Sequence, residues 1–225
     1  MLVERSMHPG WLSNAYALAD REGGVAVFAD SGADVAPLVA AVERWGARPV
    51  AILRTHAHGD HVVHEEELAA RYRIPVLAEP GQWEWEGLRV RGVATPGHCD
   101  DMVAFVVNEE VVLTGDTLFR DAVGGGDLAA IRRAVMDVLL ALPDSTRVLP
   151  GHADETTIGR ERERNPFVRV WSGAELEGSE RVRVGDREAA LVVWSPDYDG
   201  KGKAWVRFDD GTDAIVGGSR VERAR

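Results

Sequence analysis

Four of the seven histidines in this chain lie within one stretch of ten residues, "THAHGDHVVH". Its candidate metal ligands, spaced H-x-H-x-D-H, are His56, His58, Asp60 and His61. Residues two apart in an extended segment point the same way, so His56 and His58 can converge on one point. Gly59 lets the chain bend, so Asp60 and His61 can address a neighbouring point. Because imidazole and carboxylate are ligands that borderline divalent cations prefer, this stretch predicts a metal site.

Three further candidate ligands follow apolar runs elsewhere in the chain: His98 in "TPGH", Asp116 in "LTGDTLF" and His152 in "LPGH". Each of them alone would be interpreted as an ordinary loop or turn residue. Together with the histidine cluster, they place every candidate ligand where a predicted strand ends. Open α/β sheets commonly bind ligands at such an edge, so we expect all seven side chains to meet there.

The segments that must position these residues alternate between strand and helix patterns. The predicted strands are "GGVAVFADSG", "PVAILRTH", "IPVLAEP", "GLRVRGVATPGH", "MVAFVVNEEVVLTGD" and "STRVLPGH". The predicted helices are "DVAPLVAAVERWG", "HEEELAARYR" and "DLAAIRRAVMDVLLALP", of which the last has the clearest apolar stripe. Asp34 can cap the first helix, and Gly46 suits its C-terminal end. This alternation predicts a layered α/β arrangement.

The sequence pattern changes after about Pro166. Short alternating runs are separated there by Asp-Gly, Gly-Lys and Asp-Asp-Gly, which is typical of β-hairpins. We therefore expect a catalytic domain over residues 1–170 and a small β-barrel-like module over residues 171–225. The module's tryptophans, Trp171, Trp194 and Trp205, are interpreted as core residues, with a substrate pocket or an oligomer contact as the alternative.

Composition limits the classes of partner. The formal net charge of −11 over 225 residues argues against a nucleic-acid partner, because phosphate binding depends on clusters of Lys and Arg. The single cysteine, Cys99, excludes an internal disulfide, and neither a signal peptide nor a run of about 20 apolar residues is found. These features predict a soluble, cytoplasmic protein that acts on a small molecule without a membrane partner. A homodimer is one open possibility.

The series "THAHGDH", "TPGH", "GDTLF" and "PGH", in that order, resembles the metallo-β-lactamase superfamily. The segment "TTIGRERERNP" after the last histidine resembles its hydroxyacylglutathione hydrolase (glyoxalase II) branch, and the resemblance covers about residues 10–170. It implies an αββα sandwich with two divalent metal ions, zinc or alternatively iron or manganese, at one edge. The implied ligands are His56, His58 and His98 for one metal, Asp60, His61 and His152 for the other, and Asp116 as the bridge.

The resemblance implies a dinuclear hydrolase in which a metal-bridging hydroxide attacks the carbonyl of a thioester, or of a related ester or lactone. Asp60 is the expected catalytic residue, orienting the nucleophile and carrying a proton toward the leaving group. One alternative is a mononuclear iron persulfide dioxygenase of the same fold, which would use positions corresponding to His56, His98 and Asp116. Another is a binding or redox scaffold with structural metals, although structural zinc sites are usually rich in sulfur.

The chain departs from the branch in two places. "TPGH" continues as Cys99-Asp100-Asp101-Met102, an acidic pair that resembles endoribonucleases of the superfamily, and the C-terminal region is a β-module instead of a helical extension with basic residues. Three residues near the cluster are interpreted without a ligand role. Cys99 is expected to be a small buried filler or to support a ligand. His64 is expected in the first turn of a helix, either at the surface or in support of a ligand, and His8 is expected to be a loop residue.

Overall fold

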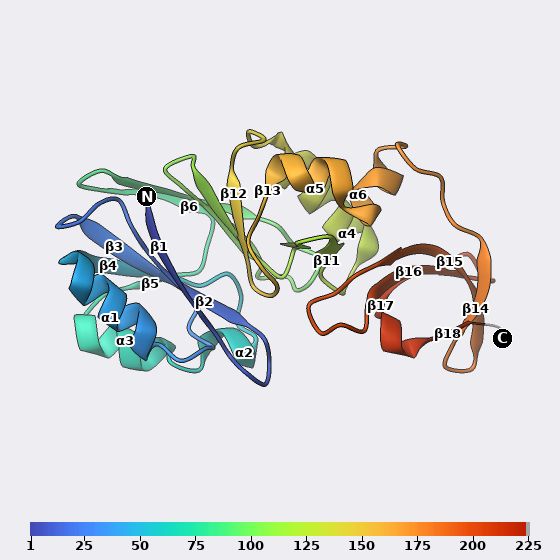
Figure 1. Ribbon diagram of the computed structural model, residues 1–225, viewed down its shortest axis with the longest axis horizontal. Helices are drawn as coiled ribbons and strands as arrows, with labels where there is room; N and C mark the ends of the chain where they lie inside the picture. Colours follow the sequence, from blue (N-terminus) through green and yellow to red (C-terminus); the bar gives the residue numbers. More distant parts are fainter. Residues whose placement is uncertain (224–225) are drawn as a thin grey trace.

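Two β-sheets lie at the centre of the computed structural model, which describes residues 1–223 (Figure 1). The first sheet has the order β1 (Leu2–Met7), β2 (Asn14–Ala19), β3 (Val25–Ala29), β4 (Arg48–Leu53) and β5 (Val76–Leu77). The second has the order β13 (Thr156–Thr157), β12 (Arg147–Pro150), β9 (Val111–Gly115), β8 (Val103–Val107), β7 (Leu88–Ala94) and β6 (Gly81–Trp85). A short hairpin pairs β10 (Leu118–Phe119) with β11 (Ala122–Val123).

The central strands of both sheets are buried on both faces. In β8, Phe105 faces the cluster between the two sheets, whereas Ala104 and Val106 face the cluster beneath the helices on the other side. In β3, Val27 faces the cluster between the sheets, and Phe28 faces the helices that cover the first sheet. Successive side chains of a strand point to opposite faces. An uninterrupted apolar run therefore places each of these strands in an inner layer.

Helices cover the outer faces of both sheets (Figure 1). The first sheet carries α1 (Ala36–Trp45) and α3 (Glu65–Tyr72), and the second carries α4 (Leu128–Arg133), α5 (Ile158–Arg164) and α6 (Pro166–Trp171). The short helix α2 (Gly59–Val62) lies in the connection between β4 and α3. Helix α1 ends at Gly46 with φ of 61°, as expected from the sequence, and the Asp34 carboxylate accepts the backbone N–H of Ala36 at 2.9 Å. The expected αββα sandwich is confirmed.

The long helix expected over residues 127–143 is interrupted. Helix α4 begins after its N-cap, Asp127, whose side chain accepts the N–H of Ala130. The chain then forms a π-helical turn, η1 (Ala134–Val138), and a 3₁₀ turn, η2 (Leu139–Ala141). The buried members of the predicted stripe still face the core across these turns. The apolar stripe therefore predicted the buried face of this segment but not its continuous hydrogen bonding.

A separate antiparallel sheet follows α6 and confirms the expected all-β module. Its order is β17 (Asp213–Gly217), β16 (Lys203–Phe208), β15 (Arg187–Ser195), β14 (Glu180–Val184) and β18 (Val221–Arg223), with a 3₁₀ turn, η3 (Gly218–Arg220), before the last strand. Trp205 and Ile215 of this C-terminal sheet belong to the same buried cluster as Phe167 and Trp171 of α6. The sheet thus packs on the helical layer, and a domain boundary at residue 171 remains a prediction.

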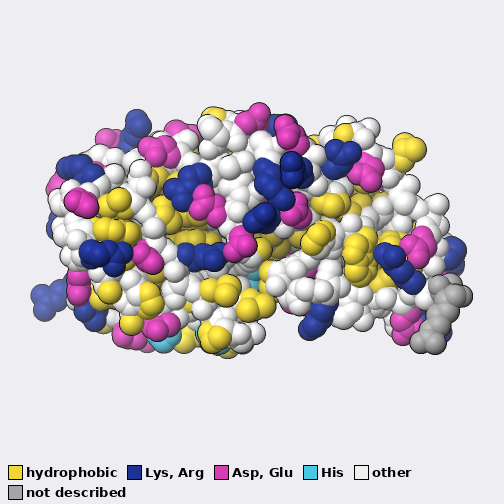
Figure 2. Space-filling model, viewed as in Figure 1, with side chains coloured by type: hydrophobic (Ala, Val, Ile, Leu, Met, Phe, Trp, Pro, Cys, Tyr) yellow, Lys and Arg dark blue, Asp and Glu magenta, His cyan; other side chains and the backbone are white. Residues whose placement is uncertain are grey.

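Acidic and basic side chains are interspersed over the face drawn in Figure 2. Among residues 1–223, no helix combines the length and the apolar composition needed to cross a membrane.

Candidate metal centre

The seven predicted ligands follow four strands whose ends meet. His56 and His58 follow β4, and Asp60 and His61 lie in the short helix α2; His98, Asp116 and His152 follow β7, β9 and β12. Strands β9 and β12 are parallel, and β7 and β9 both run antiparallel to β8 between them. The three strands of the second sheet therefore end at the same edge, where the loop after β4 of the first sheet joins them.

Three histidines form the first ligand group. The Nδ1 atom of His58 lies 3.1 Å from Nε2 of His56 and 3.0 Å from Nε2 of His98. Tetrahedral ligands at about 2.0–2.1 Å from zinc are separated from one another by about 3.3 Å. These imidazole nitrogens are thus spaced as the ligands of one small divalent cation would be.

A carboxylate and two histidines form the second ligand group. Oδ2 of Asp60 lies 3.6 Å from Nε2 of His61 and 3.4 Å from Nε2 of His152. His61 and His152 are buried, whereas Asp60 is half-buried. This group differs from the first in carrying a negative charge of its own.

Asp116 lies between the two groups. Its carboxylate is 3.7 Å from Nε2 of His98, 3.5 Å from Nε2 of His61 and 3.4 Å from Nε2 of His152. It also forms a third possible ligand group with His56 and His61. A side chain within reach of both groups is placed as a bridging ligand would be.

Two atoms in this cluster are buried without a hydrogen-bond partner, Nε2 of His61 and Oδ1 of Asp116. A buried polar atom without a partner costs on the order of 1–3 kcal/mol, more when it is charged. A cation between these two atoms would remove that cost for both. The donor set, which is all imidazole and carboxylate, therefore fits borderline divalent metals.

In four of the histidines, Nδ1 points away from the cluster and forms a hydrogen bond that orients the ring. Nδ1 of His98 contacts the carbonyl of Gly125 at 2.8 Å, and Nδ1 of His152 contacts the carbonyl of Leu12 at 3.0 Å. A carbonyl can only accept, so Nδ1 must carry the proton and Nε2 must present its lone pair to the cluster.

The same tautomer is fixed for the two remaining buried rings by Asp30. Its Oδ1 accepts the backbone N–H of Thr55 at 2.8 Å, and its Oδ2 accepts the Thr55 hydroxyl at 2.8 Å and Nδ1 of His61 at 2.9 Å. Because the Thr55 hydroxyl donates to Asp30, its oxygen accepts from Nδ1 of His56 at 3.1 Å. Buried Asp30 thus orients two histidines, yet the sequence marked it only as the end of a strand.

Gly151, which precedes His152 in "PGH", must be a glycine because the backbone passes close to the Asp116 and His61 side chains there. A Cβ atom at this position would lie 2.3 Å from Oδ1 of Asp116 and 2.9 Å from the His61 ring. A Cβ on Gly32 would similarly lie 1.5 Å from the carbonyl oxygen of Asp60. The backbone passes so close to the cluster that only glycine fits at these two positions.

The protonation of the cluster follows from burial and its carboxylates. Burial, together with the neighbouring His61, lowers the pKa of His56 to about 4. Burial acts in the same direction on His61, but the hydrogen bond and charge of Asp30, with Asp116 and Asp60, raise the pKa of His61 to about 9. Burial would raise the pKa of Asp116, but the adjacent His152 and His61 hold it well below its usual range.

The other residues singled out in the sequence lie outside the ligand groups. His64 precedes α3 and contacts Glu67 at 3.4 Å, and His8 stacks on Trp11 in the β1–β2 loop. Burial and Asp101 raise the pKa of the half-buried Cys99 thiol to about 12. Asp101 also accepts the backbone N–H of Ala57 at 3.1 Å, so this member of the acidic pair supports the histidine loop.

Of the module's tryptophans, Trp171 and Trp205 are buried, as the core interpretation expected. Trp194 is 40% exposed, so that interpretation is wrong for this side chain. The C-terminal residue that does contact the cluster is Tyr198, whose ring stacks on His152. No motif marked it, because a single tyrosine in a glycine-rich turn carries no pattern.

A scan against models of known protein families finds no match. A curated relative, the hydroxyacylglutathione hydrolase of Acidiphilium cryptum, is 34% identical in an alignment that covers 63% of this chain and 65% of that protein. An uncharacterised protein of Mycobacterium tuberculosis is 31% identical in an alignment that covers 69% of this chain and 92% of that protein.

Solved structures match the same share of the chain. The BLEG-1 B3 metallo-β-lactamase has a TM-score of 0.68 and 26% identity, and the match covers 74% of this chain and 99% of that one. The protein TTHA1623 in a di-iron-bound form has a TM-score of 0.60 and 32% identity, covering 72% of this chain and 98% of that one. These two structures are matched over almost their full length, so roughly a quarter of this chain has no counterpart in them.

Proposed function

Because the chain belongs to the metallo-β-lactamase superfamily, we propose that it is a dinuclear metal-dependent hydrolase that cleaves a thioester. One observation carries the proposal: two ligand groups lie side by side, and Asp116 is within reach of both. The likeness to a hydroxyacylglutathione hydrolase, an enzyme named for a thioester substrate, supports the substrate class.

Each ligand group would hold one metal. His56, His58 and His98 would bind the first, Asp60, His61 and His152 would bind the second, and Asp116 would bind both. When bound, two such cations lower the pKa of a water molecule and stabilise the oxyanion that develops on an attacked carbonyl. The neutral first group and the acidic second group would make the two positions chemically unequal.

Asp60 is the ligand best placed to act on the nucleophile. Its carboxylate is half-buried, so one side of it can face the reacting groups while Oδ2 faces His61 and His152. A carboxylate in this position would accept a proton from the attacking water and pass it to the thiolate that leaves. Holding that proton beside the scissile bond is the role that we assign to Asp60.

A covalent route through Cys99 is not supported. The thiol must ionise to act as a nucleophile, and burial together with the negative charge of Asp101 raises its pKa to about 12. The imidazole and carboxylate cluster offers the activated nucleophile instead. The persulfide dioxygenase alternative needs only a subset of these ligands, whereas the arrangement of Asp60, His61 and His152 favours two metals.

The proposal is tested by metal analysis together with hydrolysis of a panel of thioesters, an ester and a lactone. We expect about two equivalents of divalent metal per chain and thioester turnover that is lost on exhaustive chelation. Asp116→Ala, which removes the ligand common to both groups, should lower kcat/KM by on the order of 10³-fold. His64→Ala is the matched control, because this histidine lies beside the cluster but outside its ligand groups.

Three results would contradict the proposal. Full turnover after chelation would exclude metal-dependent hydrolysis, and one tightly bound equivalent of iron would exclude the dinuclear centre. Oxygen consumption with glutathione persulfide, in the absence of thioester hydrolysis, would favour the dioxygenase.

A further inference from the structure

The loop that connects β15 to β16, residues 196–202, extends from the C-terminal sheet toward the two central sheets (Figure 1). The ring of Tyr198 in this loop stacks on the imidazole of His152, with centroids 4.1 Å apart and planes at 15°. Phe119 packs edge-on against both rings, at 5.7 Å from Tyr198 and 5.8 Å from His152. A side chain of the C-terminal sheet thus contacts a predicted metal ligand directly.

A buried ion pair holds this loop in place. Nζ of Lys203 lies 3.0 Å from Oδ2 of Asp197, and the two side chains are only 11% and 5% exposed. Oδ1 of the same carboxylate accepts the backbone N–H of Tyr198 at 3.0 Å. Burying two charges is costly unless their geometry is well defined, so this pair fixes the conformation of the loop. The contact of Tyr198 with His152 is therefore built into the fold of the C-terminal sheet.

We propose that Tyr198 is a positioning residue for His152, and that the C-terminal sheet completes the metal centre through it. The hydrogen bond from Nδ1 of His152 to the carbonyl of Leu12 fixes one point of the ring but leaves rotation about that bond. The stacked tyrosine restricts that rotation and so keeps Nε2 directed at Asp60 and Asp116. Removing Tyr198 should therefore weaken the second ligand group and leave the first unchanged.

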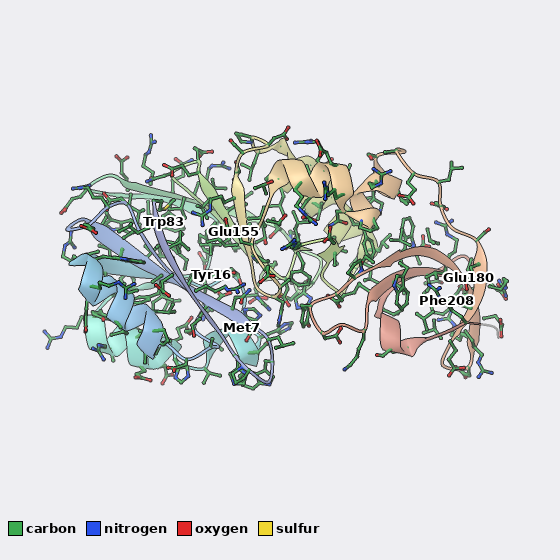
Figure 3. The ribbon with its side chains drawn as sticks, in the orientation of Figure 1. Met7, Tyr16, Trp83, Glu155, Glu180 and Phe208 are labelled. Atoms are coloured by element: carbon green, nitrogen blue, oxygen red, sulfur yellow. The ribbon has the colours of Figure 1, made fainter. Side chains whose placement is uncertain are left out.

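The same loop forms one wall of a cleft beside His152. This cavity of about 330 Å³ is lined by Met7 and Leu12 from the β1–β2 hairpin and by Pro196 and Tyr198 from the β15–β16 loop. Figure 3 labels Met7 at the end of β1, on the side of the central sheets that faces the C-terminal sheet. Leu12 and Tyr198 both line the cleft and contact His152, so the cleft adjoins the second ligand group.

The charges around this cleft are already paired. Asp121 pairs with Arg160, Asp197 with Lys203, and Asp154 with Arg5 and Arg120. The remaining lining is mostly apolar, with Met7, Leu12, Ala153 and Pro196. On the basis of the proposed function, we assign the cleft to the acyl chain of the thioester, which would be uncharged and apolar.

The positioning role is tested by titrating the metal-free full chain with Co²⁺ and following its absorption and binding heat. Tyr198→Ala should weaken the second binding event by about 10-fold and leave the first unchanged, because residues that support a ligand contribute about 10–100-fold to metal affinity. Tyr198→Phe keeps the stacked ring and should restore the affinity. Tyr72→Ala is the matched control, because Tyr72 stacks on Phe28 instead of a ligand; thermal unfolding confirms that each variant is folded.

Two titration results would overturn the positioning role: two unchanged binding events in Tyr198→Ala, or a loss in Tyr198→Phe as large as that in the alanine variant. The titration needs no substrate, so it decides the role of Tyr198 even if no thioester is hydrolysed and the proposed function fails. Where thioesters are hydrolysed, Tyr198→Ala should raise KM for an octanoyl thioester by about 10-fold more than for an acetyl thioester. An equal rise for both would contradict the acyl-chain assignment.

Discussion

The metal centre and the C-terminal sheet place their charged side chains in opposite ways. At the metal centre, charged and polar groups from four separate loops meet; His56, His61, Asp116 and His152 are buried, and two of their atoms have no hydrogen-bond partner. On the C-terminal sheet, apart from the buried Lys203–Asp197 pair, charged groups lie at the surface in arginine–carboxylate pairs between neighbouring strands and turns: Arg181–Asp209, Arg183–Glu222, Arg187–Asp210 and Arg207–Glu177.

This difference shows which charges are tied to function. Other buried polar atoms also lack a partner, but at the metal centre two ionisable atoms, Nε2 of His61 and Oδ1 of Asp116, lie together in this state. Burying such a pair destabilises the protein unless a ligand satisfies both atoms, so the pair indicates a binding site at this edge of the sheets. Exposed pairs contribute little and can be exchanged freely. The C-terminal sheet must therefore stabilise the protein mainly through its apolar face, which packs on α6. Its proposed contribution to the metal centre is the β15–β16 loop.

The largest effect on stability is expected from the apolar contact between the two regions. Trp205 is 4% exposed and belongs to the buried cluster that includes Phe167 and Trp171 of α6. Trp205→Ala should lower the free energy of unfolding by about 3–5 kcal/mol, because it leaves a large cavity in this shared core. Thermal unfolding should show one transition, shifted to lower temperature. Trp194→Ala is the control, since this side chain is 40% exposed, and it should cost less.

A separate early transition in Trp205→Ala, with the main transition unchanged, would contradict a shared core. The C-terminal sheet would then unfold independently of the α/β sandwich.

A smaller effect is expected from the carboxylate that orients the buried histidines. Asp30→Asn keeps the shape of the side chain but replaces one acceptor oxygen by a donor, which cannot satisfy both Thr55 and His61. Metal affinity, measured by competition with a chromophoric chelator, should fall by about 10–100-fold. Asp144→Asn is the control, because Asp144 is exposed and pairs only with Arg162 among the described residues. Equal affinity in both variants would show that Asp30 has no part in orienting the ligands.

The residues of the metal centre that the sequence predicted share a visible pattern. His56, His58 and His61 stand close together, and His98 and His152 each follow a Pro-Gly pair at the end of a strand. A metal site of the proposed kind would require these residue types at these places, which is why the pattern is visible in the sequence. The two inner sheets were predictable for a similar reason, because a strand buried on both faces must be apolar throughout.

The supporting residues could not be predicted, because many residue types end a strand or occupy a turn. Asp30 and Tyr198 acquire their roles only through contacts with residues far away in the sequence, His61 and His152. The π-helical turn after α4 had no local signal either, since no glycine or proline lies within residues 128–142. Strand β1 was missed because its sequence does not alternate regularly, and β2 was missed because it is a short buried run that begins with the polar Asn14.

The smallest effect is expected on the exposed face of the C-terminal sheet. Arg181 makes a bidentate pair with Asp209, at 2.7 and 3.1 Å, and lies 3.8 Å from Glu188. These distances are shorter than many at the metal centre, yet both partners are solvent-exposed, and water and salt screen their attraction. Arg181→Ala should therefore leave the unfolding midpoint and the metal affinity unchanged at physiological salt. A clear fall in the midpoint that disappears in high salt would mean that exposed pairs also hold the C-terminal sheet, and that burial does not separate the two regions as sharply as their geometry indicates.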